Sequence, residues 1–335
     1  MLLMSFDSDI AETRSLLHSW AISRKVSDEM SQSKASPSPN FSPAAALLLE
    51  KLDDRWGEYQ DRFQSCHQEF SKEAAHDLRV ATRRLLTILE ILGTLFLAMN
   101  GRKLRRELKR ELDSLDELRD TQVQIAYVVD EMAGVKDVSA FLKYLYRREA
   151  TLLKAVEHLI QTTSIANQQR RLVKVRLIAE ARLQVPEVRT RLIAAVDSSY
   201  ANVLHRHSQI NPEDPESIQR ARIAFKSFRY AMEVIHSLLV RYPVDLLKGM
   251  NDYQGLMGDI RDIEVLLEML ETFGEKRPDI NIMAPMAFVR ERHQLEVAAF
   301  LSSVEALHGF WRCSPRQPYP WNQAKGDLAF PSGKE

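Results

Sequence analysis

The chain has 335 residues, and its 45% hydrophobic content suffices for one large packed core or two of ordinary size. Its 46 basic and 46 acidic residues cancel, so any site for a polyanion must come from local segregation of charge. Two distant cysteines argue against a disulfide framework or a zinc knuckle. The first residues lack a basic segment, and Glu90 interrupts the most apolar window, so we expect a cytoplasmic protein without a signal peptide or membrane span.

Residues 1–43 are predicted to form a flexible tail and linker, because serines and prolines cluster before Pro43. From there to about residue 311, apolar residues recur every three or four positions, and no alternating strand pattern is present. The chain contains only 11 glycines. These features predict an all-α fold.

The periodicity predicts helices over 44–65, 72–99, 102–132, 137–162, 186–208, 215–241, 243–273 and 279–311, with a basic connector helix between the first four and the last four. We therefore divide the chain into a first four-helix unit (44–164), the connector (165–185), a second four-helix unit (186–312) and an irregular C-terminal tail (313–335).

A basic amphipathic helix occurs twice. In the first copy, His76, Arg79 and Arg83 fall within about 60° of one another on a helix, opposite a leucine-rich face. The stretch that begins there, residues 76–110, carries nine basic and three acidic side chains. In the second copy, one face carries three cations, Arg222, Lys226 and Arg229, the first two at an offset of 143 residues from Arg79 and Arg83. Two such helices in register indicate a duplicated unit.

A second pair of segments repeats in the same way. SLDELRD, which ends in Arg119-Asp120, aligns with GLMGDIRD, which ends in Arg261-Asp262, at an offset of 142 residues. When the helical phase is counted from the first leucine of each predicted helix, both arginines fall within a buried apolar stripe. A buried arginine needs an anionic partner or a wet cavity.

The segment HDLRVATRRL at His76, its weaker copy RIAFKSFRYAME and the two Arg-Asp pairs resemble the CHAD family, named for its conserved-histidine α-helical domain, over about residues 44–311. The resemblance implies two antiparallel four-helix bundles, related by a pseudo-two-fold axis, around a basic central cavity. It also implies non-enzymatic binding of inorganic polyphosphate. Gln219 stands where the second motif usually carries a histidine, so the second half of the site lacks that side chain. The polyphosphate-binding residues implied are His76, Arg79, Arg83, Arg84, Arg119, Arg222, Lys226, Arg229 and Arg261.

Three alternatives compete with this interpretation. A nucleic acid is also a polyanion, but single-strand binders interleave aromatic side chains with cations, and only Tyr230 stands near the basic positions. An acidic protein partner is a second alternative. His76-Asp77 matches part of an HD-type metal phosphohydrolase site, but that site needs a second upstream histidine and a distant aspartate, and His67 lies only nine residues upstream. The alternating glutamates of triphosphate hydrolases are also missing. We therefore expect no catalytic residue, metal or cofactor, and we expect a cytoplasmic binder that can associate with polyphosphate granules.

Overall fold

The computed structural model describes residues 41–95 and 101–322, and these ranges contain helices and no strand. The all-α prediction is therefore confirmed. The predicted tail up to residue 40 and the predicted end of the second helix at Met99 lie outside the described residues. The helices are α2 (Pro43–Gln68), α3 (Lys72–Leu95), α4 (Arg102–Glu131), α5 (Val138–Thr162), α6 (Ile165–Arg182), α7 (Val188–His207), α8 (Pro215–Ile235), α9 (Leu246–Lys276) and α10 (Met283–Ser303).

Proline and serine fix the start of the first described helix. Pro43 occupies the first turn of α2, where its missing N–H leaves no hydrogen bond unmade, and the Ser42 hydroxyl accepts a hydrogen bond from the Ala45 amide at 3.3 Å. The helix predicted over 215–241 is shorter than expected. It ends at Ile235, and Arg241 then takes a left-handed φ of 55° two residues before Pro243. Neither this backbone nor the approach to a proline is compatible with a continuous helix.

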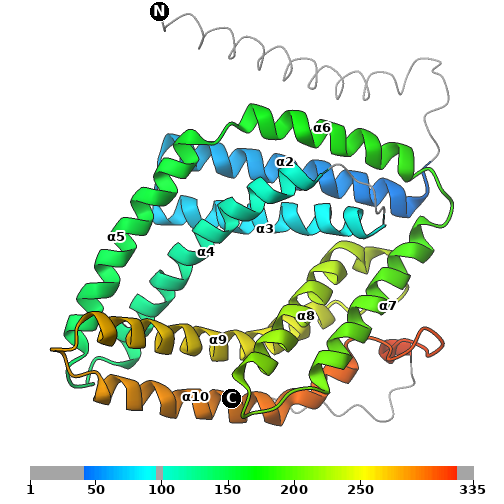
Figure 1. The fold of residues 1–335 in the computed structure, drawn as a ribbon. Coiled ribbons are helices and arrows are strands. Elements are labelled where there is room, and N and C mark those ends of the chain that lie inside the picture. Colours follow the sequence, from blue (N-terminus) through cyan, green and yellow to red (C-terminus); the bar gives the residue numbers. More distant parts are fainter. Residues whose placement is uncertain (1–40, 96–100, 323–335) are drawn as a thin grey trace, which may run out of the picture.

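Consecutive helices pack against each other as four pairs: α2 with α3, α4 with α5, α7 with α8, and α9 with α10. Figure 1 shows these pairs as the sides of a four-sided frame, with α6 lying beside α2. One long helix of each pair, namely α3, α4, α8 or α9, lies on the inner side of the frame. The two duplicated segments found in the sequence are therefore carried by the four inner helices.

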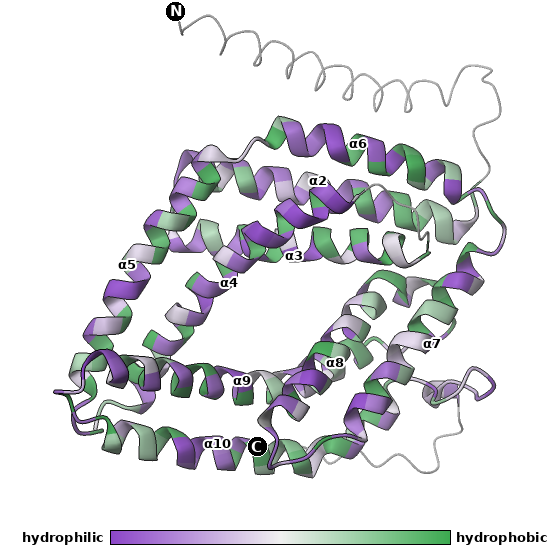
Figure 2. Ribbon diagram, viewed as in Figure 1, coloured by the Kyte–Doolittle hydropathy of each residue, from purple (hydrophilic) through white to green (hydrophobic). Residues whose placement is uncertain are grey.

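Two apolar cores hold the frame together. The larger one joins α2, α3, α4 and α6 to α7, α8 and the first half of α9. The smaller one lies where α4 and α5 meet α9 and α10, and includes Phe141 and Phe273 with ring centroids 5.5 Å apart. Hydrophobic and hydrophilic residues alternate around the helices in Figure 2, as amphipathic packing requires. Each core therefore combines residues from both halves of the chain.

None of the helices in the described part of the chain is both long enough and apolar enough to cross a lipid bilayer.

Candidate functional site

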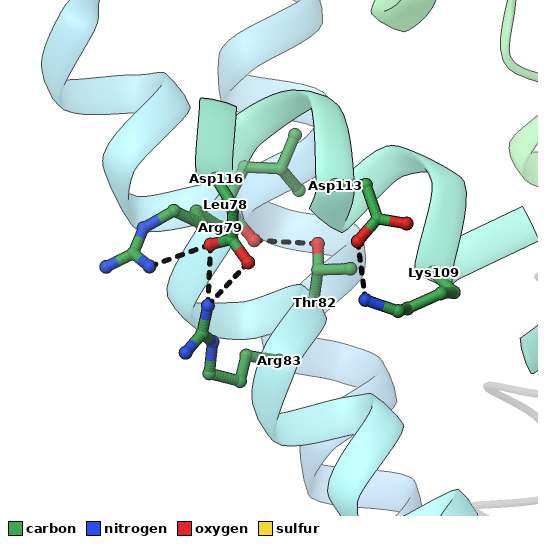
Figure 3. A network of polar contacts seen from close by, with 7 residues as sticks. All are labelled: Leu78, Arg79, Thr82, Arg83, Lys109, Asp113 and Asp116. Carbon is green, nitrogen blue, oxygen red and sulfur yellow. Dashed lines mark hydrogen bonds and ion pairs between the residues drawn. The ribbon is translucent and has the colours of Figure 1, made fainter. Parts of the chain in front are cut away.

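The α3 arginines of the basic motif share one carboxylate. Arg79 donates to Asp116 of α4 at 3.0 Å, and Arg83 donates to both oxygens of the same carboxylate, one of them at 2.8 Å. Figure 3 shows the two guanidinium groups converging on Asp116. Each arginine side chain is 19% exposed. Their Nε atoms are buried and find no hydrogen-bond partner among the described residues, so each arginine keeps a donor unused.

The α8 cations of the same cluster have no such carboxylate. Arg222 and Lys226 make no ion pair with any residue in the described ranges, and the buried Nε of Arg222 also finds no partner there. Burial, reinforced by the charges of Arg83 and Arg222, lowers the pKa of Lys226 to about 7. Burial likewise lowers the pKa of Arg222, and Arg83 across the cluster adds to that effect. The positive charges of α3 and α8 therefore repel one another at short range.

Two carboxylates on the other inner helices moderate this repulsion. Burial raises the pKa of Asp120 on α4, and it raises the pKa of Asp262 on α9 to about 6. The negative charge of Asp116 raises the pKa of Asp120 further, and the charge of Asp120 does the same for Asp262. The positive charge of Arg222 acts in the opposite direction on both carboxyl groups. We call Arg79, Arg83, Arg222 and Lys226, with the carboxylates Asp116, Asp120 and Asp262 that face them, the inner cluster.

Arg229, expected at the site, has a packing role. Its side chain is 10% exposed, its Nε donates to the Gln254 side chain at 2.8 Å, and its guanidinium group pairs with Glu233 one turn away. It also lies over the ring of Tyr230, with 4.4 Å between its Cζ and the ring centroid. Arg229 therefore joins α8 to α9, and Glu233 orients its guanidinium group.

The two arginines of the repeated Arg-Asp pairs differ. Arg261 is partly buried and pairs with Glu264 at 3.3 Å and Glu268 at 2.9 Å, both on its own helix. Arg119 is exposed and forms no ion pair with the residues that the structure describes, so its predicted place in the buried stripe is wrong. The buried leucines of α4 follow a seven-residue spacing, which drifts by about 20° per repeat relative to an ideal helix. By Leu118 the stripe has moved away from Arg119.

Arg84 and His76 are not brought into the ion pairs of the inner cluster. Arg84 is exposed and donates to Glu58 of α2 at 2.6 Å, because it follows Arg83 and so points about 100° away from it. His76 is also exposed, near Arg79 and Arg119. Partial desolvation of its ring and these two positive charges lower its pKa, which favours the neutral imidazole at pH 7.

The sequence interpretation missed the residues that accompany the cations. Asp116 lies within the quoted segment SLDELRD, one turn before Asp120, and that spacing was the available signal. A cavity of about 370 Å³ adjoins the cluster between α3, α4, α7 and α8. Arg83, Lys226 and Tyr230 line it together with apolar side chains of α7. Across the described ranges, no three His, Cys, Asp or Glu side chains are grouped so as to hold a metal ion.

Comparison with known proteins agrees with this architecture. The family model described as the CHAD domain matches residues 50–271, from α2 to α9. Among solved structures, the crystal structure of the CHAD domain from the plant Ricinus communis is similar to this chain, with a TM-score of 0.63 and 16% sequence identity. The match covers 82% of this chain and 93% of that one. No curated protein matches the chain.

Proposed function

Because this chain belongs to the CHAD family, we propose that it binds inorganic polyphosphate at the inner cluster, without cleaving it. One observation supports this proposal most directly. Buried guanidinium donors of Arg79, Arg83 and Arg222 have no partner in the described part of the chain, and they lie in a cluster that also holds Lys226. Buried donors normally have a hydrogen-bond partner, and a bound anion would provide the acceptors that these donors lack.

Polyphosphate has the chemistry that these side chains recognise. It carries about one negative charge per phosphate and offers oxygen acceptors along its whole length. Arginine can direct two N–H donors at one phosphate, and a lysine ammonium group adds a compact charge. In the unbound protein, burial and repulsion from Arg83 and Arg222 lower the pKa of Lys226. A bound phosphate would reduce that repulsion.

Both copies of the duplicated basic helix contribute cations to the proposed site. Arg79 and Arg83 on α3 correspond to Arg222 and Lys226 on α8, and the structure brings both pairs to the same cluster. In the family description, the two halves are four-helix bundles related by a pseudo-two-fold axis around a basic cavity. Phosphates of one polyphosphate chain would then contact both halves, and such a binder could accompany polyphosphate granules inside the cell.

The test is a titration of the full chain with fluorescently labelled polyphosphate of medium length, at two salt concentrations. Affinity should fall steeply as salt rises, because bound phosphates release counterions. Single-stranded DNA and orthophosphate serve as competitors, and released orthophosphate is measured in parallel. The proposal requires that polyphosphate displaces DNA far more readily than the reverse. Turnover of polyphosphate, or stronger binding of DNA, would contradict it.

A further inference from the structure

We infer, on the basis of the proposed function, that the two halves of the inner cluster are unequal: the α8 cations Arg222 and Lys226 form the primary phosphate site, and Gly258 of α9 keeps them available. The α3 arginines are held by Asp116, which acts as an internal competitor for the ligand. Gly258 thus determines where on the cluster an anion binds.

The first observation is the difference in pairing. Asp116 bridges Arg79 and Arg83, with contacts of 3.0 Å and 2.8 Å. The corresponding cations of α8, Arg222 and Lys226, have no ion pair within ranges 41–95 and 101–322. A phosphate that binds the α3 arginines must replace a carboxylate at ion-pair distance, whereas the carboxylates that face Arg222 and Lys226 form no ion pair with them.

The second observation is the residue at the equivalent position. The register that aligns Arg119-Asp120 with Arg261-Asp262 also aligns Asp116 with Gly258. Asp262 faces Arg222, and Gly258 lies one turn before Asp262 on the same face of α9. Along α8, Lys226 lies one turn after Arg222. Arg229 of α8 donates to Gln254 of α9, and Arg222 faces Asp262. Gly258 is midway between Gln254 and Asp262 on one face of α9, so it lies on the side toward Lys226.

The third observation is the space beside this glycine. A Cβ atom built on Gly258 would meet no heavy atom within 4 Å. Packing therefore does not require glycine here, although glycine in a helix interior is less favourable than alanine by roughly 1 kcal/mol. The open space lies on the face of α9 that carries Asp262, and there a phosphate group of a bound chain can approach the backbone.

The test compares the polyphosphate affinity of the unchanged chain with that of Gly258→Asp, Asp116→Asn and a matched control, Gly57→Asp. Gly57 is also a helical glycine with open space at its Cβ, but it lies on α2, outside the four inner helices. Gly258→Asp should supply the missing carboxylate and weaken binding by roughly tenfold or more. Gly57→Asp should stay within about twofold of the unchanged chain. Asp116→Asn should bind more tightly, because it frees both α3 arginines.

Equal affinities for Gly258→Asp and Gly57→Asp would overturn the inference, and so would an unchanged affinity in Asp116→Asn. A second readout separates it from the proposed function: the rate at which an amine-acylating reagent labels Lys226, followed by mass spectrometry with and without tripolyphosphate. The inference predicts that tripolyphosphate protects Lys226 from labelling in the unchanged chain but not in Gly258→Asp. That result would support the inference even if long polyphosphate did not bind, which would contradict the proposed function. Labelling that tripolyphosphate does not change in the unchanged chain would overturn it.

Discussion

The charge state of Lys226 should make phosphate binding depend on pH, since its pKa of about 7 lies well below the usual 10.5. The charged groups facing it are Arg222 on its own helix, Arg79 and Arg83 on α3, and Asp116 on α4. Only the protonated amine attracts a phosphate. A bound anion must raise this pKa again, so binding takes up a proton when the pH exceeds 7.

The lowered pKa of Lys226 determines how strongly the affinity for polyphosphate should depend on pH. If a bound phosphate restores the pKa to its ordinary value, raising the pH from 7 to 9 should weaken polyphosphate binding roughly 50-fold, because the unbound lysine passes from half protonated to about 1% protonated. Lys226→Arg keeps the positive charge at every pH in this range. The cavity that Lys226 lines leaves room for the larger side chain.

Isothermal titration calorimetry of both proteins at several pH values, in two buffers of different ionisation enthalpy, measures affinity and proton uptake together. The unchanged chain should lose affinity with rising pH and take up close to one proton near pH 8. Lys226→Arg should do neither. Contributions from the ends of polyphosphate and from other residues are common to both proteins and cancel in the comparison. Identical pH dependences would refute the assignment of Lys226 as a phosphate contact.

Three further outcomes follow from individual contacts. Glu111 is buried and accepts hydrogen bonds from Tyr59 and Thr82, and burial raises its pKa to about 7. Because the folded chain holds this proton more tightly than the unfolded chain, about 3 kcal/mol of stability should be lost as the pH rises from about 4.5, the ordinary carboxyl value, to about 7. The melting temperature of Glu111→Gln should not show that loss, and an equal fall in both proteins would contradict the reasoning. Arg229→Ala should lower the free energy of unfolding by about 2 kcal/mol in urea titrations, since it leaves Glu233 without its partner; an unchanged stability would count against a packing role. Arg84→Ala should change polyphosphate affinity less than threefold in the same titration, because Arg84 pairs with Glu58 outside the cluster; a larger loss would return Arg84 to the site.

Local sequence signals predicted the helices and many of their faces. The leucine stripe of α4 and the stripe of Met250, Tyr253, Met257 and Ile260 in α9 are buried as their spacing indicated. The pairing of Arg229 with Glu233 could also be expected, because residues four apart on a helix are neighbours.

Contacts between helices could not be predicted in the same way. Asp116 is 33 residues from Arg83, and their pairing depends on the angle and register at which α3 and α4 pack. Whether Arg222 and Lys226 find a partner depends on what α9 presents to them, which no spacing within α8 can show. Arg119 was wrongly predicted to be buried because a small drift in helical phase accumulates over two heptads.

The double variant Arg222→Ala/Lys226→Ala tests most directly whether the inner cluster binds polyphosphate through the α8 cations. Its affinity for medium-length polyphosphate, measured by calorimetry at fixed salt and pH 7, should fall roughly a hundredfold if each lost charged contact is worth about 1.5 kcal/mol. Its circular dichroism should keep the helical signal of the unchanged chain, and Arg79→Ala/Arg83→Ala should lose less affinity, because Asp116 already occupies those arginines. A double variant at α8 that stays helical and binds polyphosphate as tightly as the unchanged chain would contradict the account.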